Sequence, residues 1–376
     1  MSLTLQTFVL RPPPLHDSPS EPKAVIHFTG GAFVGASPQL TYRHLLEGLA
    51  SRGFVIVATP FETNFEHLRI TDDVHVKYTR GMAALGPRVA GLKVFGLGHS
   101  LGALLQLLLC SRYGCEREGN VLISFNNKPV TDAIPFYSEL ISPATSGLAP
   151  VLSALANSPQ AKILDALGEQ LRAGTSDEVR QLFPLIDQLQ PIFEDISNDR
   201  LEFSPTPEES RRMVQRRYGV SRNLLVRFLD DNIDETPDLS LTLQGLSQGQ
   251  PGAVPGTAGN MDLSVRTLPG DHATPCQQPL PEEIPSQIAA VASQGSDIFG
   301  VIAGISELAS SATGLPESPI TGIAKNVQKG FESVNDNLQG STEASVEQVE
   351  ALEQEIVLWS GIEPRVVPQL PGGPSS

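Results

Sequence analysis

The stretch FGLGHSLGALLQLLL, residues 95–109, places Gly98, Ser100 and Gly102 at alternate positions where an apolar strand pattern changes into a helical one. In so tight a turn the serine backbone is strained and its neighbours nearly touch, which favours glycines without a Cβ atom. A strand, a Gly-x-Ser-x-Gly turn and a helix form the nucleophile-elbow pattern, which holds a serine hydroxyl above the C-terminal edge of a sheet. The pattern predicts that Ser100 is a nucleophile, and the alternative interpretation is a serine that only caps the helix.

Short apolar runs alternate with helical patterns on both sides of this turn. The expected strands are residues 24–30, 54–60, 92–98, 120–127 and 223–228, with a short β-like run at 263–270. Strands that are apolar on both faces and alternate with helices are typical of a mostly parallel sheet covered on both faces. The sequence therefore predicts an α/β fold.

The domain organisation follows from where this alternation stops. Core segments are expected over 1–135 and 223–280, and the helical patterns between them, at 136–222, predict an inserted cap. Residues 281–344 are rich in Gly and Ser and predict a low-complexity helical insert or linker. Residues 345–376 predict a helix followed by a disordered tail. The apolar face of this helix would consist of Val346, Val349, Leu352, Ile356 and Trp359.

Composition excludes several kinds of partner. The 376 residues carry a formal net charge of −16, which disfavours binding to nucleic acid and to anionic membranes. The first 14 residues show no signal peptide and no run of 18 apolar residues is present, so neither export nor a transmembrane segment is expected. A peripheral membrane helix within 281–345 is disfavoured because basic flanking residues are lacking. Three cysteines fit a reducing compartment, and we expect a cytoplasmic protein with no cofactor and no metal site.

A serine hydroxyl needs a base to act as a nucleophile near neutral pH. Of seven histidines, only His272, in the turn-rich segment LPGDHATP, follows Ser100 in the chain. Nucleophile-elbow folds have the chain order serine, acid, histidine. This order selects His272 as the base, with a surface loop histidine as the alternative. His99 adjoins the nucleophile and must point away from it, so we expect a structural role for His99.

The acid is expected just after the strand at 223–228, where the sequence reads LDDNIDET. Asp231, three residues past the strand end, is the first choice, and Asp230 and then Asp234 are the alternatives. Adjacent aspartates cannot both face the same histidine. The acid would accept the ring N–H of His272 and fix its tautomer. The alternative is that all these carboxylates are solvated in a loop.

Two backbone N–H groups are needed to stabilise an oxyanion. We expect one from Leu101, the residue after the serine, and the other from the glycine-rich segment FTGGAFVGAS, residues 28–37. Gly31 and Ala32 are its best candidate donors. Candidates for lining a substrate pocket are Gly30, Phe33, His67 and Asn126. The alternative for His67 is a solvated or capping role, and the alternative for Asn126 is that it only ties its turn.

Several long segments together resemble an uncharacterised family of α/β-hydrolase-like proteins from cyanobacteria and plant plastids. They are HFTGGAFVGASPQLTYRHLLEGLASRGFVIVATPF, GHSLGALLQLLL, LISFNNKP, FSPTPEESRRMVQRRYGVSRNLLVRF and LPGDHATP. The resemblance covers roughly residues 5–275 and the helix near 345–362. It implies an α/β-hydrolase fold and a photosynthetic lineage, and it implies no substrate.

These features predict a serine hydrolase that acts on a small-molecule ester or thioester. An apolar acyl part is expected, since the helices of the predicted cap offer Leu and Ile in place of charges. The alternative is a non-catalytic binding or scaffold protein on the same fold, because a fold does not determine function. Acyl transfer or non-ester chemistry on the same three side chains is a third option.

Overall fold

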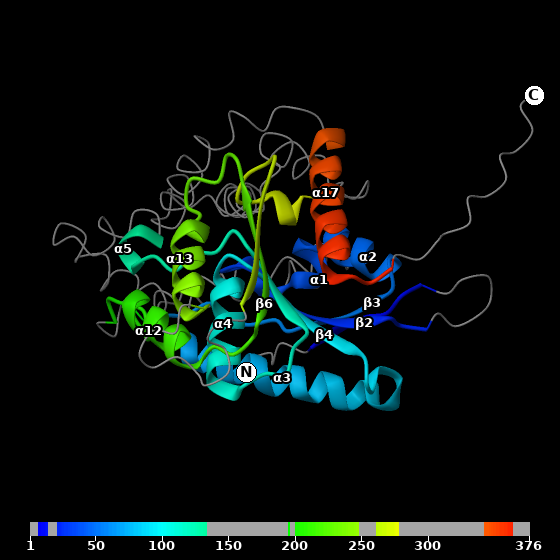
Figure 1. The fold of residues 1–376 in the computed structure, drawn as a ribbon, viewed down its shortest axis with the longest axis horizontal. Coiled ribbons are helices and arrows are strands. Elements are labelled where there is room, and N and C mark those ends of the chain that lie inside the picture. The colour runs from blue at the N-terminus through cyan, green and yellow to red at the C-terminus, as the bar shows by residue number, and fades with distance from the viewer. Residues whose placement is uncertain are drawn as a thin grey trace, which may run out of the picture.

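One sheet forms the centre of the structure (Figure 1). The computed structural model describes residues 7–13, 21–133, 195, 200–247, 261–277 and 342–363. The strands in these ranges are β1 (Phe8–Leu10), β2 (Ala24–Thr29), β3 (Phe54–Ala58), β4 (Lys93–His99), β5 (Gly119–Ile123), β6 (Arg222–Phe228) and β7 (Asp262–Leu268). Their order is β1-β3-β2-β4-β5-β6-β7, and every neighbouring pair is parallel except β1 with β3. The predicted α/β class with a mostly parallel sheet is confirmed.

The sheet gains one strand that the sequence analysis did not assign. β1 is three residues long and pairs antiparallel with the outer side of β3, with Phe8 opposite Ala58. Its residues are only half-buried, and so short a run carries little periodic signal. β1 closes the edge that β3 would otherwise expose to another chain.

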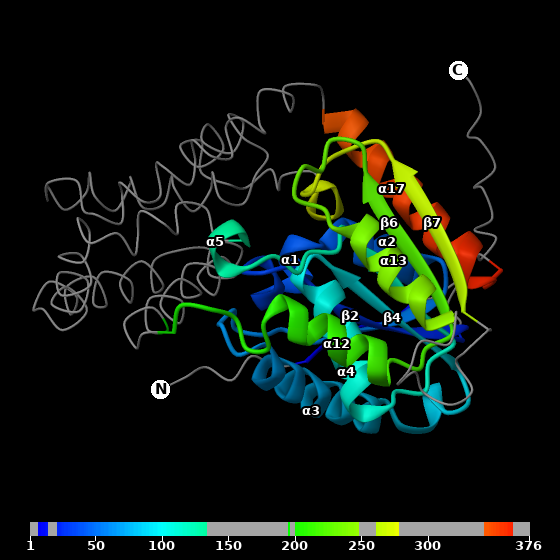
Figure 2. The same ribbon diagram turned by 60° about the vertical axis from the view of Figure 1, so that its left-hand side comes forward.

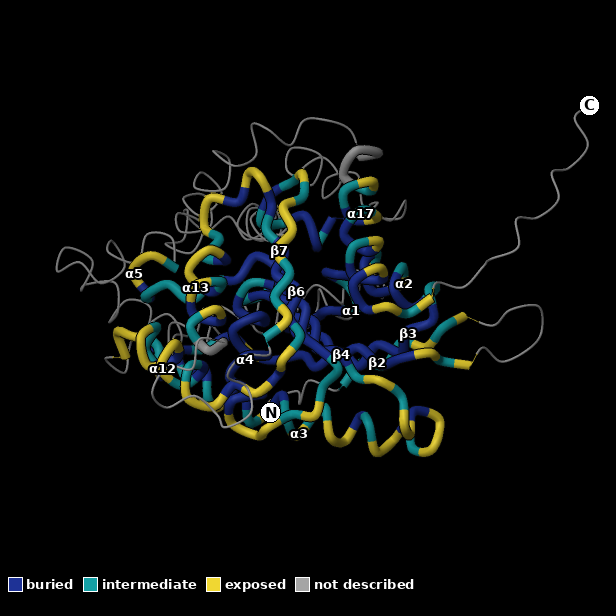
Figure 3. Tube along the Cα trace, in the orientation of Figure 1, coloured by how far each residue is buried: buried dark blue, intermediate teal, exposed yellow. Residues whose placement is uncertain are grey.

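The central strands are buried on both faces because side chains alternate along each strand. In β2, Ile26 and Phe28 point into one apolar cluster, whereas Val25 lies in a second cluster on the opposite face. All six residues of β2 are buried, and so are all five of β3 and of β5. Figure 3 shows this burial as a dark interior with exposed outer helix surfaces.

Helices cover the two faces of the sheet in separate groups (Figure 2). One face carries α2 (Arg43–Ser51) and α17 (Thr342–Ser360), which contact each other. The opposite face carries α3 (His67–Leu85), α4 (Leu101–Tyr113), α12 (Pro207–Arg217) and α13 (Thr236–Ser247). The remaining short helices are α1 (Pro38–Thr41), α5 (Val130–Ala133), and the single-turn segments Val34–Ala36, Gly86–Val89 and Thr274–Cys276.

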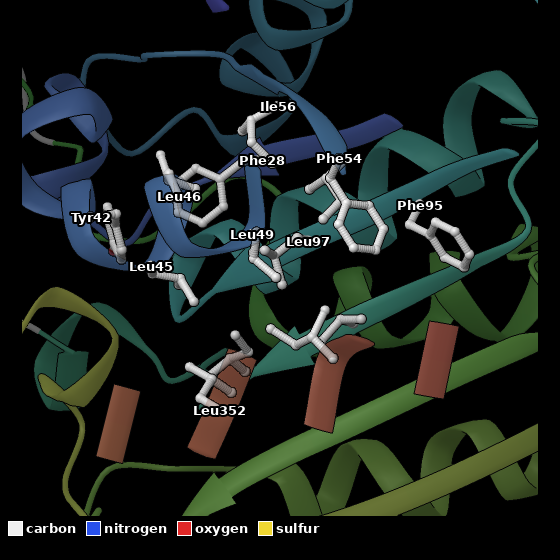
Figure 4. Packing of buried hydrophobic residues seen from close by; sticks show 14 of the residues in the cluster. Phe28, Tyr42, Leu45, Leu46, Leu49, Phe54, Ile56, Phe95, Leu97 and Leu352 are labelled. Carbon is white, nitrogen blue, oxygen red and sulfur yellow. The ribbon is translucent and has the colours of Figure 1, made fainter. Parts of the chain in front are cut away.

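The cluster beneath α2 and α17 joins elements from both ends of the chain (Figure 4). Leu45 and Leu49 of α2 pack with Phe28 of β2 and Phe95 of β4, and Leu352 of α17 belongs to the same cluster. Each of these side chains is at most 2% exposed. Burying a side chain of this size stabilises the fold by roughly 1.5–3 kcal/mol relative to leaving it in water.

The end of the predicted cap range lies in the helical layer of the sheet. α12 begins after Thr206, whose hydroxyl accepts the N–H of Glu209, while the Glu209 carboxylate accepts the N–H of Thr206. This capping box is typical of a helix start. α12 packs against α4, and Val214 is buried in the same cluster as Leu104. Residues 136–194 and 196–199 of the predicted cap lie outside the described residues. Nearly all of the predicted insert at 281–344 also lies outside them.

An ion pair joins α17 to the end of α2. Glu353, 1% exposed, lies against Arg52, and a side chain on Gly48 would collide with its carboxylate. Burial raises the pKa of Glu353 to about 7, while the Arg52 charge opposes this rise and Glu350 adds to it. A carboxyl with a raised folded pKa stabilises the fold fully below its unfolded pKa and loses that contribution as the pH rises through the folded pKa.

Glu353→Gln is therefore expected to make the protein less sensitive to alkaline pH. Between about pH 5 and about pH 8, its free energy of unfolding should rise relative to wild type by about 2–3 kcal/mol, because glutamine cannot ionise. Urea denaturation at a series of pH values measures this difference. Glu347→Gln, at an exposed position of the same helix, is the control and should follow wild type. Parallel curves for wild type and Glu353→Gln would contradict the prediction.

Candidate active site

Ser100 lies on a strained turn between β4 and α4. β4 ends at His99, Ser100 has φ 55° and ψ −121°, and α4 begins at Leu101. A positive φ is uncommon for serine and marks a position where the surrounding structure holds the backbone. A Cβ on Gly98 would lie 2.7 Å from the backbone of Ala103, and one on Gly102 would collide with the backbone that follows β2. Both glycines are required by close backbone approach, as the sequence analysis predicts.

Three loops at the C-terminal edge of the sheet bring Ser100, His272 and Asp231 into contact. The Ser100 Oγ lies 3.0 Å from the His272 Nε2, and the His272 Nδ1 lies 2.8 Å from the Asp231 Oδ2. A carboxylate only accepts hydrogen bonds, so the Nδ1 carries the proton and donates it to Asp231. The Nε2 is then free to accept the Ser100 hydroxyl proton. Ser100 follows β4, Asp231 follows β6 and His272 follows β7.

The loop after β6 decides which aspartate faces His272. The N–H group of Leu229 bonds to Leu268 at the end of β7 and that of Asp230 bonds to Gly270 just after it, and the chain then turns at Asp231. Asp230 is exposed, whereas the side chain of Asp231 is 0% exposed. The Ile233 N–H donates to the Asp231 Oδ1 at 3.1 Å, which fixes the carboxylate. Among the three candidates it is Asp231 that contacts His272.

The pKa values of Asp231 and Asp234 are shifted in opposite directions. Burial alone would raise the pKa of Asp231, but the hydrogen bond and charge of His272 outweigh it and the pKa is lowered. The buried Asp234 carboxylate accepts the Thr236 hydroxyl at 2.5 Å, and burial raises the pKa of Asp234. A carboxylate with a lowered pKa stays charged at neutral pH, as stabilisation of an imidazolium requires.

The loop after β2 lies beside Ser100 but offers fewer free donors than expected. A Cβ on Gly31 would lie 3.4 Å from the Cβ of Ser100. The Gly31 N–H donates to the Tyr42 hydroxyl at 2.7 Å, so Gly31 is not a free donor and this part of the prediction is wrong. In the described part of the chain, no acceptor engages the N–H groups of Leu101 and Ala32.

Tyr42 links the three loops around Ser100. Its hydroxyl accepts the Gly31 N–H and lies 2.7 Å from the His99 Nδ1, while the His99 Nε2 lies 2.9 Å from the backbone oxygen of His272. That oxygen only accepts, so the His99 Nε2 carries the proton and the Tyr42 hydroxyl donates to the Nδ1. Burial, with a smaller effect of His272, lowers the pKa of His99 to about 3. Neutral His99 therefore anchors the backbone of His272.

The four pocket candidates have different surroundings. Gly30 is packed against Gly35 and Tyr42, so it is not open to a ligand. Phe33 has φ 63° and packs against Phe65 and Val130.

His67 and Asn126 contact other parts of the protein. His67 is buried and stacks on Phe203 at 4.5 Å, and burial lowers the pKa of His67 to about 4. The Asn126 Nδ2 donates to the backbone oxygen of Ile233 at 3.0 Å, which ties the loop after β5 to the acid loop. Asn126 thus takes the role in tying its turn, the alternative that the sequence left open.

No helix in the described residues is both long and apolar enough to cross a bilayer. Within the same ranges, no three side chains of His, Cys, Asp or Glu are grouped as ligands of a metal ion would be.

Solved structures of several lipolytic enzymes and thioesterases show a distant similarity to the chain. A structure titled for LipS and LipT, two metagenome-derived lipolytic enzymes, is 14% identical with a TM-score of 0.38, covering 72% of this chain and 91% of that one. A lipase-esterase related protein from Clostridium acetobutylicum is 10% identical with a TM-score of 0.38, covering 72% and 93%. A thioesterase domain from the curacin biosynthetic pathway is 14% identical with a TM-score of 0.36, covering 68% and 87%.

These similarities concern the fold alone. The chain has the mostly parallel sheet, the flanking helices and the strand–serine–helix turn of the α/β-hydrolase fold. No curated protein sequence matches the chain. A family of unknown function, DUF1350, matches residues 17–299. Because this match spans more than half of the sequence, the chain belongs to the DUF1350 family of proteins of unknown function.

Proposed function

We propose that the protein is a serine hydrolase that cleaves an ester or thioester with an apolar acyl part. The observation that carries the proposal is the continuous hydrogen-bonded path from the Ser100 Oγ through His272 to Asp231, at 3.0 and 2.8 Å. A serine, a histidine and a buried carboxylate in this order activate the serine for attack on a carbonyl carbon.

The reaction runs in two halves. Ser100 attacks the acyl carbonyl as His272 takes the hydroxyl proton, and Asp231 stabilises the imidazolium that forms. The N–H groups of Leu101 and Ala32 hold the oxyanion, and the N-terminus of α4 adds its dipole. His272 then protonates the leaving alcohol or thiol. A water molecule activated by His272 attacks the acyl-enzyme, and release of the acid restores Ser100.

The preference for an apolar acyl group rests on an aromatic cluster at the same edge of the sheet. Phe33 follows β2, Phe65 follows β3, and Phe203 precedes α12; all three pack together with Val130. The rings of Phe65 and Phe203 meet edge to face at 5.2 Å. Phe65 and Val130 are buried, so the partly exposed Phe33 and Phe203 are the members of the cluster that can contact an acyl chain, and removing hydrocarbon from water there is favourable.

Labelling with a fluorophosphonate tests the proposal. This reagent reacts with activated serines, so wild-type protein should be labelled once, and peptide mapping by mass spectrometry should place the label on Ser100. A series of nitrophenyl esters and acyl thioesters from acetyl to palmitoyl should then show kcat/KM rising with acyl length. Folded protein that takes up no label and cleaves no ester or thioester would favour the non-catalytic alternative.

A further inference from the structure

The end of α4 opposite Ser100 brings two cysteines together. α4 ends at Tyr113, and Gly114 adopts the left-handed conformation with φ 62° while its N–H donates to the Cys110 oxygen at 3.0 Å. This arrangement is typical of a helix end where the chain turns back on the last turn. It returns Cys115 to Cys110, and both side chains contact the same apolar cluster. Cys110 is buried, and Cys115 is partly exposed.

A donor points at the Cys110 sulfur. The Asn120 Nδ2 donates to it at 3.6 Å, and the Cys115 thiol lies near enough to share its proton with Cys110. Asn120 is 0% exposed and is held by β5, so its position is fixed by the sheet. Hydrogen bonds to sulfur favour the thiolate over the thiol, because the negative charge accepts them more strongly.

Arg117 adds a positive charge to this cluster. Its Nη2 donates to the His27 Nδ1 at 2.7 Å, and its guanidinium carbon lies 5.5 Å from the ring centre of Tyr78. The Nε and Nη1 are buried, and among the described residues neither has a well-aligned hydrogen-bond partner and no carboxylate pairs with Arg117. An unpaired buried charge destabilises a fold by several kcal/mol. The thiols of Cys110 and Cys115 both lie near Arg117, and a thiolate on this pair supplies the opposite charge.

The ionisation of the two thiols follows from these contacts. Burial raises the pKa of Cys110, but the hydrogen bond shared with Cys115, the Arg117 charge and the hydrogen bond from Asn120 outweigh it and lower the pKa. The proton that remains on the pair is held between the two sulfurs, which raises the pKa of Cys115. These contacts favour the loss of one proton from the pair.

We propose that Cys110 and Cys115 form a redox-active dithiol that exchanges with small disulfides such as glutathione disulfide. Cys115, after its proton passes to Cys110, attacks the small disulfide, forms a mixed disulfide and releases one small thiolate, which takes up a proton. Cys110 then loses its proton and attacks the Cys115 sulfur, so the Cys110–Cys115 bond forms as the bond to the second small thiol breaks. Two protein thiols are oxidised, and one small disulfide is reduced to two thiols.

Arg117 makes this disulfide easy to reduce. A positive charge beside Cys110 stabilises the reduced form through its thiolate, and a stabilised reduced form gives a more oxidising disulfide. Cys110 lies on the helix that begins next to Ser100 and Cys115 follows the end of that helix, but in the described structure neither contacts the three hydrolase side chains. The proposal therefore stands independently of the hydrolase activity.

Equilibration in glutathione redox buffers tests the proposal. Wild-type protein is quenched with an alkylating reagent at each ratio of thiol to disulfide, and peptide mapping follows each cysteine. Cys110 and Cys115 should lose their reactivity together as one linked peptide forms. In Arg117→Met the midpoint should shift about tenfold or more toward the disulfide, because the reduced form loses its stabilising charge. Arg112→Met, an exposed arginine on the same helix end, is the matched control and should titrate like wild type.

Two results would overturn the proposal. One is a pair that stays reduced at every ratio, and the other is an unchanged midpoint in folded Arg117→Met. If Arg117→Met fails to fold, the ultraviolet absorbance of thiolate in reduced wild type serves instead. It should rise through an ionisation below the usual pKa of a thiol, and that rise should be absent in Cys110→Ser. A wild-type titration without that ionisation would likewise reject the proposal.

Discussion

Replacing Ser100 with alanine is expected to abolish fluorophosphonate labelling and to lower kcat for any ester or thioester that the protein cleaves by roughly 10⁴–10⁶-fold. The Oγ is the attacking atom and lies 3.0 Å from the His272 Nε2, and alanine leaves no atom in that place. The melting temperature should stay within a few degrees of wild type, since alanine keeps the Cβ and the lost hydroxyl is a partly exposed group. Gel-based labelling, steady-state kinetics and circular dichroism measure these three quantities.

The partners of Ser100 provide the internal comparison. His272→Ala should lose nearly as much activity as Ser100→Ala, and the double variant should lose little more, because side chains that act as one unit have non-additive effects. Ser221→Ala, at an exposed serine before β6, should be labelled and should turn over as wild type does. Residual labelling of Ser100→Ala at the wild-type rate would mean that another residue reacts, and would remove Ser100 from the proposed mechanism.

Asp231→Asn should slow the reaction by roughly 10³–10⁴-fold while the fold persists. The amide of asparagine can present an N–H to the His272 Nδ1, which moves the imidazole proton to the Nε2 and leaves no acceptor for the Ser100 hydroxyl. The loss should appear mainly in kcat, with KM little changed, because the carboxylate is buried behind His272 and does not face the substrate. Kinetics with a reactive nitrophenyl ester measure both parameters.

The neighbouring carboxylates separate this effect from a general change of charge. Asp230→Asn removes a charge one residue away at an exposed position and should leave the rate within a few fold of wild type. Asp234→Asn alters a buried carboxyl that already has a raised pKa, so its effect should be on stability in place of kcat. A large loss of kcat in Asp230→Asn or Asp234→Asn, with an active Asp231→Asn, would assign the acid to a different residue.

Local chemistry explains which parts of the site the sequence predicts. The elbow depends on residues within one turn, so the spacing of Gly98, Ser100 and Gly102 is enough to predict it. His272 follows from chain order, since no other histidine lies after Ser100. The choice among Asp230, Asp231 and Asp234 depends on where the ladder between β6 and β7 ends, which the sequence shows only to within a residue or two.

Contacts between distant elements explain what the sequence does not predict. Gly31 lies in a suitable loop, yet its N–H is taken by Tyr42, which reaches it from the chain between α1 and α2. No periodic pattern marks a tyrosine for this contact. From the sequence, Arg117 is an ordinary charged residue after a helix. In the structure, β2, α3 and α4 pack around it and place its charge beside Cys110.

The place of α17 in the core has a consequence for how the protein is made. Leu352 and Ile356 cover the strand and α2 residues of the first half of the chain, but they are translated well after those residues. The segment from His272 to Ser360 takes a ribosome on the order of ten seconds, at roughly 5–20 residues per second. During that interval the nascent chain already contains Ser100, Asp231 and His272, while the apolar surface of α2 still lacks the helix that will cover it. Molecular chaperones therefore have a defined surface and a defined time in which to bind.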